Sequence, residues 1–363
     1  DKALQVIEEQ TEKLENKVHS PLYLNKLDYL KDSKPKIEKI DMEKIRVQMA
    51  RRAPGKDKTA TTRLEADEPQ VLSGLFNGVT TGAPLAAIIA NTNTRSKDYS
   101  DLKIHPRPGH ADYTASVRYD GANDIRGGGH FSGRLTACLV FAGAVCRQIL
   151  ERRGITIGAH AYAVGSAKDT PFDPVNVSKD DLNALNTRFF AVNSPKAEEK
   201  MRAEIEAARL DADSIGGIIE CAAVGVPAGI GSPMFGGIEN VFASILYGIP
   251  AVKGVEFGAG FDVACMRGSE NNDAFYYDEN GLVRTKTNNA GGILGGITTG
   301  MPILFRIAVK PTPSIGREQH TVDLTTKTNA DLTIHGRHDP CIVPRAIPVA
   351  EAAAALALMD LLR

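Results

Sequence analysis

The spacing of hydrophobic residues divides the chain into a short amphipathic start and a longer, glycine-rich remainder. Residues 1–40 carry a narrow apolar stripe of heptad type among many Glu and Lys residues, at Leu4, Ile7, Thr11, Leu14 and Val18. This pattern predicts a short amphipathic or coiled-coil helix, which a Lys/Asp/Pro-rich linker follows. We therefore expect a separate helical segment at residues 1–40 and a main domain at residues 41–363.

Beyond the linker, helical periodicity predicts one buried helix and several amphipathic ones. The buried helix should begin after Ser132, a favourable N-cap residue, and run from Leu135 to Arg152. It is apolar nearly all round, so we expect it in the core. In residues 197–210 the apolar residues share one side, and Glu198 and Arg202 stand four positions apart as an ion pair. That pattern is typical of a surface helix.

The other expected elements are shorter. Helices are expected at Asp41–Met49, Gly237–Tyr247 and Val349–Leu362, and strands at Ala251–Phe257 and Ile303–Val309. Turn sequences rich in Gly and Pro separate many further short apolar runs. Several helices among many short strands, without an internal repeat, indicate an α+β or mixed α/β fold.

The composition is that of an ordinary globular protein. The chain has 363 residues, of which 42% are hydrophobic and 24% are charged, so it can bury a large core. Its 43 basic and 44 acidic residues give a net charge of -1, which provides no general attraction to nucleic acid or to an anionic membrane. No apolar run approaches the ~20 residues that span a bilayer, and the acidic start does not resemble a signal peptide. We therefore expect a cytoplasmic protein whose anion sites are local.

The five cysteines are scattered and odd in number, and none stands in a CxxC spacing. This argues against a disulfide framework and against a structural zinc site.

A glycine-rich segment at the start of the buried helix is a candidate anion site. The chain contains neither a GxGxxG dinucleotide motif nor a GxxxxGK[ST] phosphate loop. Instead, residues 126–134 read RGGGHFSGR, which brings backbone N–H groups, glycines and a cation to a helix N-terminus. The same residues would also suit a tight helix-entry turn, and the sequence favours neither interpretation.

A histidine between a cation and a carboxylate is a candidate general acid. His110 lies in the segment from Arg107 to Tyr113, which Pro and Gly stiffen and which includes Asp112. An imidazole near its ordinary pKa of about 6.5 can protonate a leaving group at neutral pH. The alternative is a structural histidine, which is the commoner case for a single His.

Two His, one Asp and one Cys crowd into residues 335–341 and suggest a metal site at first sight. If this segment is extended, His335, Arg337 and Asp339 share one face and His338 points to the other, and no second ligand cluster occurs elsewhere. We therefore expect no metal. Arg337 beside Asp339 fits an anion-binding cation next to a functional carboxylate, or a structural ion pair.

Two further segments carry polar groups or glycines at strand ends. Residues 310–314, KPTPS, combine a cation, two hydroxyls and a stiff backbone, which suits a phosphate or a polar ring edge, or a plain surface turn. Residues 291–296, GGILGG, would allow close backbone packing or would form a ledge for a flat cofactor.

Taken together and in this order, the segments resemble the chorismate synthase family from about Ile40 to Arg363. Nine segments carry the resemblance: residues 51–55, 95–99, 107–113, 127–134, 213–217, 266–270, 291–296, 310–314 and 336–341. Each is a weak motif by itself, but nine in family order across about nine-tenths of the chain are specific.

The resemblance implies a fold, an assembly and a reaction. The fold is α+β, with helices sandwiched between two four-stranded antiparallel sheets, and the assembly is a homotetramer. The reaction is the 1,4-elimination of phosphate and a ring hydrogen from 5-enolpyruvylshikimate 3-phosphate, which gives chorismate. It requires reduced FMN although no net oxidation or reduction occurs.

The resemblance also implies roles for individual residues. The family's arginine clamp for the anionic substrate matches Arg52, Arg107, Arg134 and Arg337. His110 matches the histidine that assists phosphate departure, and Asp339 matches the carboxylate that helps to take up the substrate's proton. Flavin contacts match His130, Phe131, Ser132, Ala251, Gly295, Lys310, Pro311, Thr312, Pro313, Ser314 and Arg337. Arg52 with Lys58 matches a proposed NADP contact, which would make NADPH the reductant of the flavin.

The chain departs from the family pattern at two places. Residues 130–135 read HFSGRL where much of the family has RSSARE, although Ser132 and Arg134 keep their register. Residues 1–40 contain no Gly-x-Ser-His-Gly motif, whose His contacts the flavin in the family, and His19 lacks the flanking glycines. Two alternatives therefore stay open: a non-catalytic or impaired member that binds flavin and phosphate, and a flavin-dependent oxidoreductase that turns over NAD(P)H.

Overall fold

The structure is a computed structural model that describes residues 37–55, 57, 59, 61, 65–91, 101–334 and 339–362. The helix expected in the first 40 residues, and positions 335–338, lie outside these residues. The chain divides into two compact units: Asp1–Lys39 with Val71–Ala86, and Ile40–Gln70 with Ala87–Arg363.

Among the described residues of the first unit, two short strands form a small hairpin. Strands β2 (Leu75–Phe76) and β3 (Val79–Thr80) pair in antiparallel fashion. Asn77 and Gly78 at its tip have φ angles of 47° and 74°, which is the backbone geometry of a type I′ turn. Strands β1 (Pro69–Ser73) and β4 (Ala86–Ile89) pair with each other, and each contains residues of both units.

The second unit is built on a five-stranded antiparallel sheet with the strand order β6-β5-β7-β13-β8. Its strands are β5 (Thr156–Val164), β6 (Ala167–Lys168), β7 (Gly217–Val224), β8 (Val252–Phe257) and β13 (Ile303–Val309). The three central strands are buried along most of their length. Burial of both faces requires that the layers on either side exclude water, which explains why these strands are apolar runs rather than alternating sequences.

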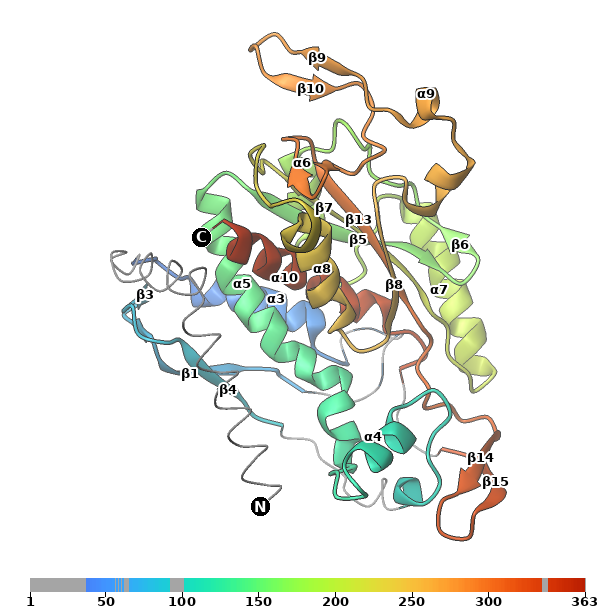
Figure 1. Ribbon diagram of the computed structural model, residues 1–363. Helices are drawn as coiled ribbons and strands as arrows, with labels where there is room; N and C mark the ends of the chain where they lie inside the picture. Colours follow the sequence, from blue (N-terminus) through green and yellow to red (C-terminus); the bar gives the residue numbers. More distant parts are fainter. Residues whose placement is uncertain are drawn as a thin grey trace, which may run out of the picture. The chain divides into compact units, whose positions relative to one another are not determined.

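Four helices gather on one side of this sheet, as Figure 1 shows. They are α3 (Met42–Arg52), α5 (Thr136–Arg152), α8 (Ile238–Tyr247) and α10 (Val343–Leu361). Helix α10 packs on the other three and on β5 and β7. Gly143 of α5 allows the close approach of α10, since a Cβ atom at this position would lie 2.3 Å from the Cβ of Ala352.

The remaining elements are short or peripheral. The helices are α4 (Asp112–Arg118), α6 (Lys179–Leu185), α7 (Pro195–Leu210) and α9 (Gly268–Asn271), and the 3₁₀ segments are η2 (Asp101–Lys103), η3 (Arg126–Phe131), η4 (Gly133–Leu135), η5 (Met234–Gly236) and η6 (Gly260–Cys265). Three antiparallel two-stranded sheets complete the second unit: β9 (Phe275–Tyr277) with β10 (Val283–Thr285), β11 (Ile293–Leu294) with β12 (Ile297–Thr298), and β14 (Gln319–Asp323) with β15 (Thr328–Leu332).

Most of the predicted elements are confirmed. Helix α3 follows Asp41, whose side chain caps it by accepting a hydrogen bond from Glu43 N. Helix α7 has the predicted ion pair, with Arg202 Nη2 2.8 Å from Glu198 Oε1. Helix α5 is long and apolar enough to cross a membrane, but it is mostly buried in the protein and is a core helix.

The predicted start of the last helix is wrong. Helix α10 begins at Val343, six residues before the expected Val349. Pro344 and Pro348 lie in this stretch, and proline is disfavoured in the interior of a helix. Pro344 lies in the first turn, where a helix has no partner for the backbone N–H that proline lacks. Pro348 lies inside the helix and is buried, so packing against the core outweighs its missing hydrogen bond.

The mixed α+β class is confirmed, but the described residues do not form the two four-stranded sheets that we expected. These residues form one five-stranded sheet and five two-stranded sheets. The fifth strand arises because β6 folds directly back onto the edge of β5. The strands of β1 and β4 are half-exposed, so they do not provide the buried face that a second core sheet needs.

A buried ion cluster ties the helices to the sheet. Glu351 of α10 accepts hydrogen bonds from Arg51 of α3 at 2.6 and 3.0 Å and from Arg147 of α5 at 2.9 Å. It also accepts one from the backbone of Ala159 in β5 at 3.1 Å. Removal of one member of such a cluster leaves uncompensated buried charge, so this contact fixes the relative positions of the elements that surround the site.

Candidate active site

A cavity of about 630 Å³ brings together segments that are far apart in the sequence. The ends of α3, α5 and α10 line it, together with the loops around residues 107–111, 128–134, 249–253 and 310–314. Of the residues singled out from the sequence, it is lined by Arg52, Arg107, His110, His130, Phe131, Ser132, Arg134, Ala251, Lys310, Thr312, Pro313, Ser314 and Asp339. Its volume suits a ligand of the size of a drug or cofactor.

Asp112 organises the histidine and one of the arginines. Its carboxylate accepts hydrogen bonds from Arg107 Nε at 2.7 Å, Arg107 Nη2 at 2.8 Å and the backbone N of Arg107 at 3.0 Å. It also lies 2.6 Å from His110 Nδ1. Burial by itself would raise the pKa of Asp112, but the hydrogen bonds from Arg107 and His110 outweigh it and hold the pKa below its ordinary value. An ionised carboxylate can only accept here, so His110 donates through Nδ1, while its Nε2 lies 3.4 Å from Arg107 Nη2.

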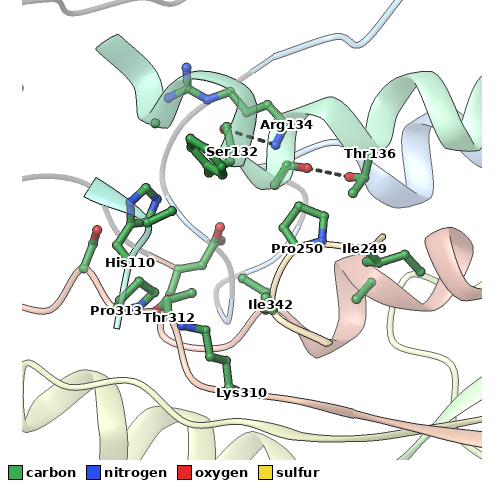
Figure 2. Close-up of a pocket in the computed structure, with 18 of the residues that line it drawn as sticks. His110, Ser132, Arg134, Thr136, Ile249, Pro250, Lys310, Thr312, Pro313 and Ile342 are labelled. Carbon is green, nitrogen blue, oxygen red and sulfur yellow. Dashed lines mark hydrogen bonds between the residues drawn. The ribbon is translucent and has the colours of Figure 1, made fainter. Parts of the chain in front are cut away.

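The same segment is tied to the strand end at residues 310–314. Arg107 Nη1 donates to Ser314 Oγ at 3.0 Å, and Lys310 Nζ donates to the carbonyl of Gly109. Burial, and then the charge of Lys253, lower the pKa of Lys310. These contacts place several donors and cations on one wall of the cavity. Figure 2 shows His110, Thr312, Pro313 and Lys310 along this wall.

The glycine-rich loop forms the opposite part of the site. Ser132 caps η4, the 3₁₀ segment that leads into α5, because its hydroxyl accepts a hydrogen bond from the backbone N of Arg134 at 3.2 Å. The loop is thus a helix-entry turn, and it also lines the cavity as an anion site would. Gly128 and Gly129 have φ angles of 84° and 53°, which favour glycine, and Gly128 packs beside the His110 ring, where a Cβ would lie 3.5 Å from Nε2.

Arg52 lies at the end of α3 and is almost fully buried. It forms an ion pair with Asp67, donates to Thr136 Oγ1 at 3.2 Å and donates to the carbonyl of Gly133 at 3.1 Å. Burial lowers its pKa, and the neighbouring Asp67 offsets part of this effect. Arg52 thus braces the helix entry at the same time as it lines the cavity.

Asp339 is held from two sides. Its Oδ1 accepts a hydrogen bond from the backbone N of Thr61 at 2.7 Å, and its Oδ2 accepts one from Arg345 Nη1. Its backbone carbonyl accepts a hydrogen bond from Thr312 Oγ1 at 2.8 Å. The carboxylate is therefore fixed relative to the strand end that also carries Lys310 and Ser314.

One part of the remaining wall is apolar. Ile249, Pro250, Val252, Ile342 and Val349 line it, and Figure 2 shows Ile249, Pro250 and Ile342 on the side away from His110. Between them, Ala251 has a φ angle of 77°, a strained conformation for a residue with a Cβ, and its carbonyl accepts a hydrogen bond from Lys310 N at 3.0 Å. The cavity thus combines a cationic side with an apolar side.

Some predicted contacts are not among the lining residues. Gly295 lies in the turn between β11 and β12, and neither it nor Pro311 lines the cavity. The glycines around Gly295 serve close backbone packing, since a Cβ at Gly292 would lie 2.5 Å from the carbonyl oxygen of Pro302. Arg337 and Lys58 lie outside the described residues.

The structure also adds residues that the sequence reasoning missed. Glu65, Lys253 and Arg345 line the cavity, and Asp67 pairs with Arg52. Arg345 had a signal in the sequence, since it is a cation four residues after the Pro340-Cys341 pair at a helix start, where a cation is electrostatically disfavoured. No such signal marked Glu65 or Asp67. Asp67, for example, pairs with Arg52, which lies 15 residues earlier in the chain.

The chain is similar to chorismate synthases in sequence and in fold. A family model described as Chorismate synthase matches residues 27–362. A chorismate synthase of Korarchaeum cryptofilum is 47% identical over 312 residues, which cover 85% of this chain and 84% of the relative. One of Pyrococcus abyssi is 49% identical over 324 residues, with 89% and 88% coverage. A solved structure titled "Crystal Structure of Chorismate Synthase" has a TM-score of 0.66 at 27% identity, and the match covers 88% of this chain and 82% of that one.

Proposed function

This chain belongs to the chorismate synthase family, and from this premise we propose that the cavity lined by the ends of α3, α5 and α10 is its active site. The chain catalyses the elimination of phosphate from 5-enolpyruvylshikimate 3-phosphate to give chorismate, with reduced FMN as the cofactor of the family. The observation that carries the site is the gathering of His110, Arg107, Arg134, Lys310 and Asp339 around one cavity.

The cationic side of the cavity fits the substrate. The substrate carries two carboxylates and a phosphate, and charged hydrogen bonds from guanidinium groups recognise such groups best. We assign Arg52, Arg107, Arg134 and Arg337 to this clamp. Arg52 and Arg107 are held by Asp67 and Asp112, so they are already oriented before a ligand arrives and lose little conformational freedom on binding.

The residues present also fit a flavin. A flat ring system needs apolar surface, which Ile249, Pro250 and Val252 provide, and its polar edge and phosphate need donors, which Lys310 and Thr312 provide. We assign its contacts to His130–Ser132, Ala251 and Lys310–Ser314, with Gly295 and Arg337 as further contacts carried over from the family. Reduced FMN, when bound, supplies an electron for the bond cleavages and recovers it at the end.

His110 acts on the departing phosphate as a general acid. The Asp112 carboxylate accepts a hydrogen bond from Nδ1 and fixes the orientation of the ring, so that Nε2 is the nitrogen from which a proton can be transferred. As the C–O bond breaks, this proton passes to the leaving phosphate oxygen. Arg107, which Asp112 holds beside the ring, stabilises the phosphate charge that develops.

Asp339 takes part in removal of the ring proton. Its ionised carboxylate helps to take up that proton as the C–H bond breaks, which completes the elimination without net oxidation. Thr61 N and Arg345 hold its two oxygens, and each oxygen keeps a lone pair for a proton. The apolar wall excludes water and strengthens each of these electrostatic interactions.

Four features of the whole protein complete the proposal. The protein is cytoplasmic, and residues 41–363 form the catalytic domain while residues 1–40 form a separate helical segment. NADPH reduces the flavin, with Arg52 and Lys58 as its contacts. The assembly is a homotetramer, which is supported by exposed aromatic and apolar side chains on the described surface: Met234 and Phe235 in η5, Phe261 in η6, and Phe275 and Tyr277 in β9.

An anaerobic assay tests the proposed function. Purified protein, chemically reduced FMN and 5-enolpyruvylshikimate 3-phosphate should release chorismate and inorganic phosphate in equal amounts. The His110→Ala variant should be slower by ~10²–10⁴-fold, the contribution typical of a positioned acid, while flavin affinity and thermal midpoint stay near those of the wild type. A destabilised but fully active variant would show that His110 is structural.

A further inference from the structure

We infer that Arg345, to which the family resemblance assigns no role, is a positioning residue that holds the Asp339 carboxylate in its place in the cavity. The inference rests on the proposed role of Asp339 in proton removal. Arg345 lies in the first turn of α10 and lines the cavity itself.

The contacts of Arg345 connect two parts of the site. Its Nη1 donates to Asp339 Oδ2, and its Nε donates to the backbone carbonyl of Arg52 at 3.0 Å. Arg345 therefore links the carboxylate to the end of α3, where Arg52 belongs to the substrate clamp. A change in the position of either segment would be transmitted to the other through one planar guanidinium group.

The place of Arg345 in its helix argues for a role beyond folding. The dipole of a helix disfavours a cation in the first turn, and α10 has no acidic residue there to offset it. Asp339, which precedes the helix, supplies that compensation through the ion pair. The exposed fractions of the two side chains are 15% and 13%, so solvent screens this pair less than it screens a surface pair.

Several other charged or titratable groups surround the ion pair between Arg345 and Asp339. Arg52 of α3 lies close enough to Arg345 that the two cations repel each other, and Asp67 compensates Arg52. Glu65 lines the cavity from the loop after α3, and Cys341, two residues after Asp339, is buried. His110 and Lys310 line the cavity as well. Loss of Arg345 would leave Asp339 Oδ2 without the cation that donates to it, so the position of the carboxylate would depend on Thr61 N alone among the contacts of the described residues.

The separate effects on kcat and KM in the full-length protein test this role. In the anaerobic assay with reduced FMN and 5-enolpyruvylshikimate 3-phosphate, Arg345→Gln should lower kcat per folded molecule by about 10–100-fold, as small displacements of a reacting group do, with KM changed much less. A wild-type kcat per folded molecule would overturn the inference.

Arg345→Lys separates charge from geometry. It keeps the positive charge but cannot donate to Asp339 and to the Arg52 carbonyl at once, so we expect a partial rescue, with kcat lowered about 3–10-fold relative to the wild type. A wild-type kcat in this variant would overturn the positioning role, even if Arg345→Gln does not fold. Arg209→Gln is the matched control, since it removes an exposed Arg–Glu pair in α7 and should leave kcat and KM unchanged.

Asp339→Asn distinguishes failure of the inference from failure of the proposed function. It should lower kcat by ~10²–10⁴-fold if the carboxylate takes part in proton removal. Full activity of Asp339→Asn would refute the proposed role of Asp339 itself. An inactive Asp339→Asn together with a normal Arg345→Gln would refute only the inference about Arg345.

Discussion

The replacement of Asp112 by Asn is the sharpest single test of how the site is organised. Asp112 is 5% exposed and holds Arg107 and His110 through contacts of 2.6–3.0 Å. Asparagine has nearly the same shape, but it carries no charge and presents one oxygen and one NH₂ group where the carboxylate presents two acceptors. At least one donor therefore loses its partner.

The structure sets the size of the expected effects. Hydrogen bonds to charged groups contribute about 1.5–3 kcal/mol each, and a buried cation without its partner costs about 3–5 kcal/mol. We expect Asp112→Asn to lower the free energy of unfolding by about 3 kcal/mol at pH 7. Turnover should fall by ~10²–10⁴-fold, because Nδ1 of His110 is no longer held as a donor and Nε2 no longer presents its proton.

The effect on stability should depend on pH in one direction. The pKa of Asp112 is held below its ordinary value in the folded protein, so its contribution is present above the unfolded pKa of about 3.9 and is lost as the pH falls through the folded value. The difference in stability between wild type and variant should therefore be constant from pH 6 to 8 and should shrink in acid.

Thermal unfolding and single-turnover rates on the same samples provide the assay. Asp124→Asn is the control, since Asp124 makes the same kinds of contact to the backbone N, Nε and Nη2 of Arg126 but is 56% exposed. The control should change stability by less than about 1 kcal/mol and leave turnover intact. If Asp112→Asn is as active and as stable as this control, the carboxylate does not organise the site.

Three further predictions follow from other contacts. Glu351→Ala should lower the free energy of unfolding by about 3–5 kcal/mol in urea titrations, because two buried arginines lose their partner, and a change below about 1 kcal/mol would contradict the buried cluster. His160 lies between two buried carboxylates; burial lowers its pKa, but these hydrogen bonds outweigh burial and raise it above the ordinary value. Its stabilisation is therefore complete below about pH 6.5 and is lost as the pH rises through the raised value, and His160→Gln should abolish this part of the pH dependence of the thermal midpoint. Arg134→Ala should raise the KM for the substrate at least tenfold, since a charged hydrogen bond contributes about 1.5–3 kcal/mol, whereas Arg202→Ala on the surface helix should not, and equal effects would argue against the clamp.

Local sequence signals were sufficient for the longer helices. Asp41 and Ser132 marked the starts of α3 and of the 3₁₀ turn before α5, because their side chains bond to backbone N–H groups two residues later, and that interaction needs no distant partner. The all-round apolar pattern of residues 135–152 identified the core helix α5. The start of α10 was predicted six residues too late; its first turns contain two prolines, and Pro348 is held in the helix by burial in the core.

The sequence predicted which residue types form the site, but not how they are arranged. Arg107, His110 and Asp112 lie within six positions, so short-range geometry already favoured their contact. The order of nine motifs identified the family and, through it, the reaction. The sequence by itself thus determined the kind of chemistry and the local groups that perform it.

Tertiary structure alone decided which distant groups meet. Asp339 receives its hydrogen bonds from Thr61, 278 residues away, and from Arg345, which itself bonds to Arg52, 293 residues away. Arg107 reaches Ser314 across 207 residues. Nothing in the local sequence specifies such pairs, because they exist only once the core has packed α3, α5 and α10 against one sheet. The partners of the charged groups, and with them their protonation and orientation, are therefore properties of the fold.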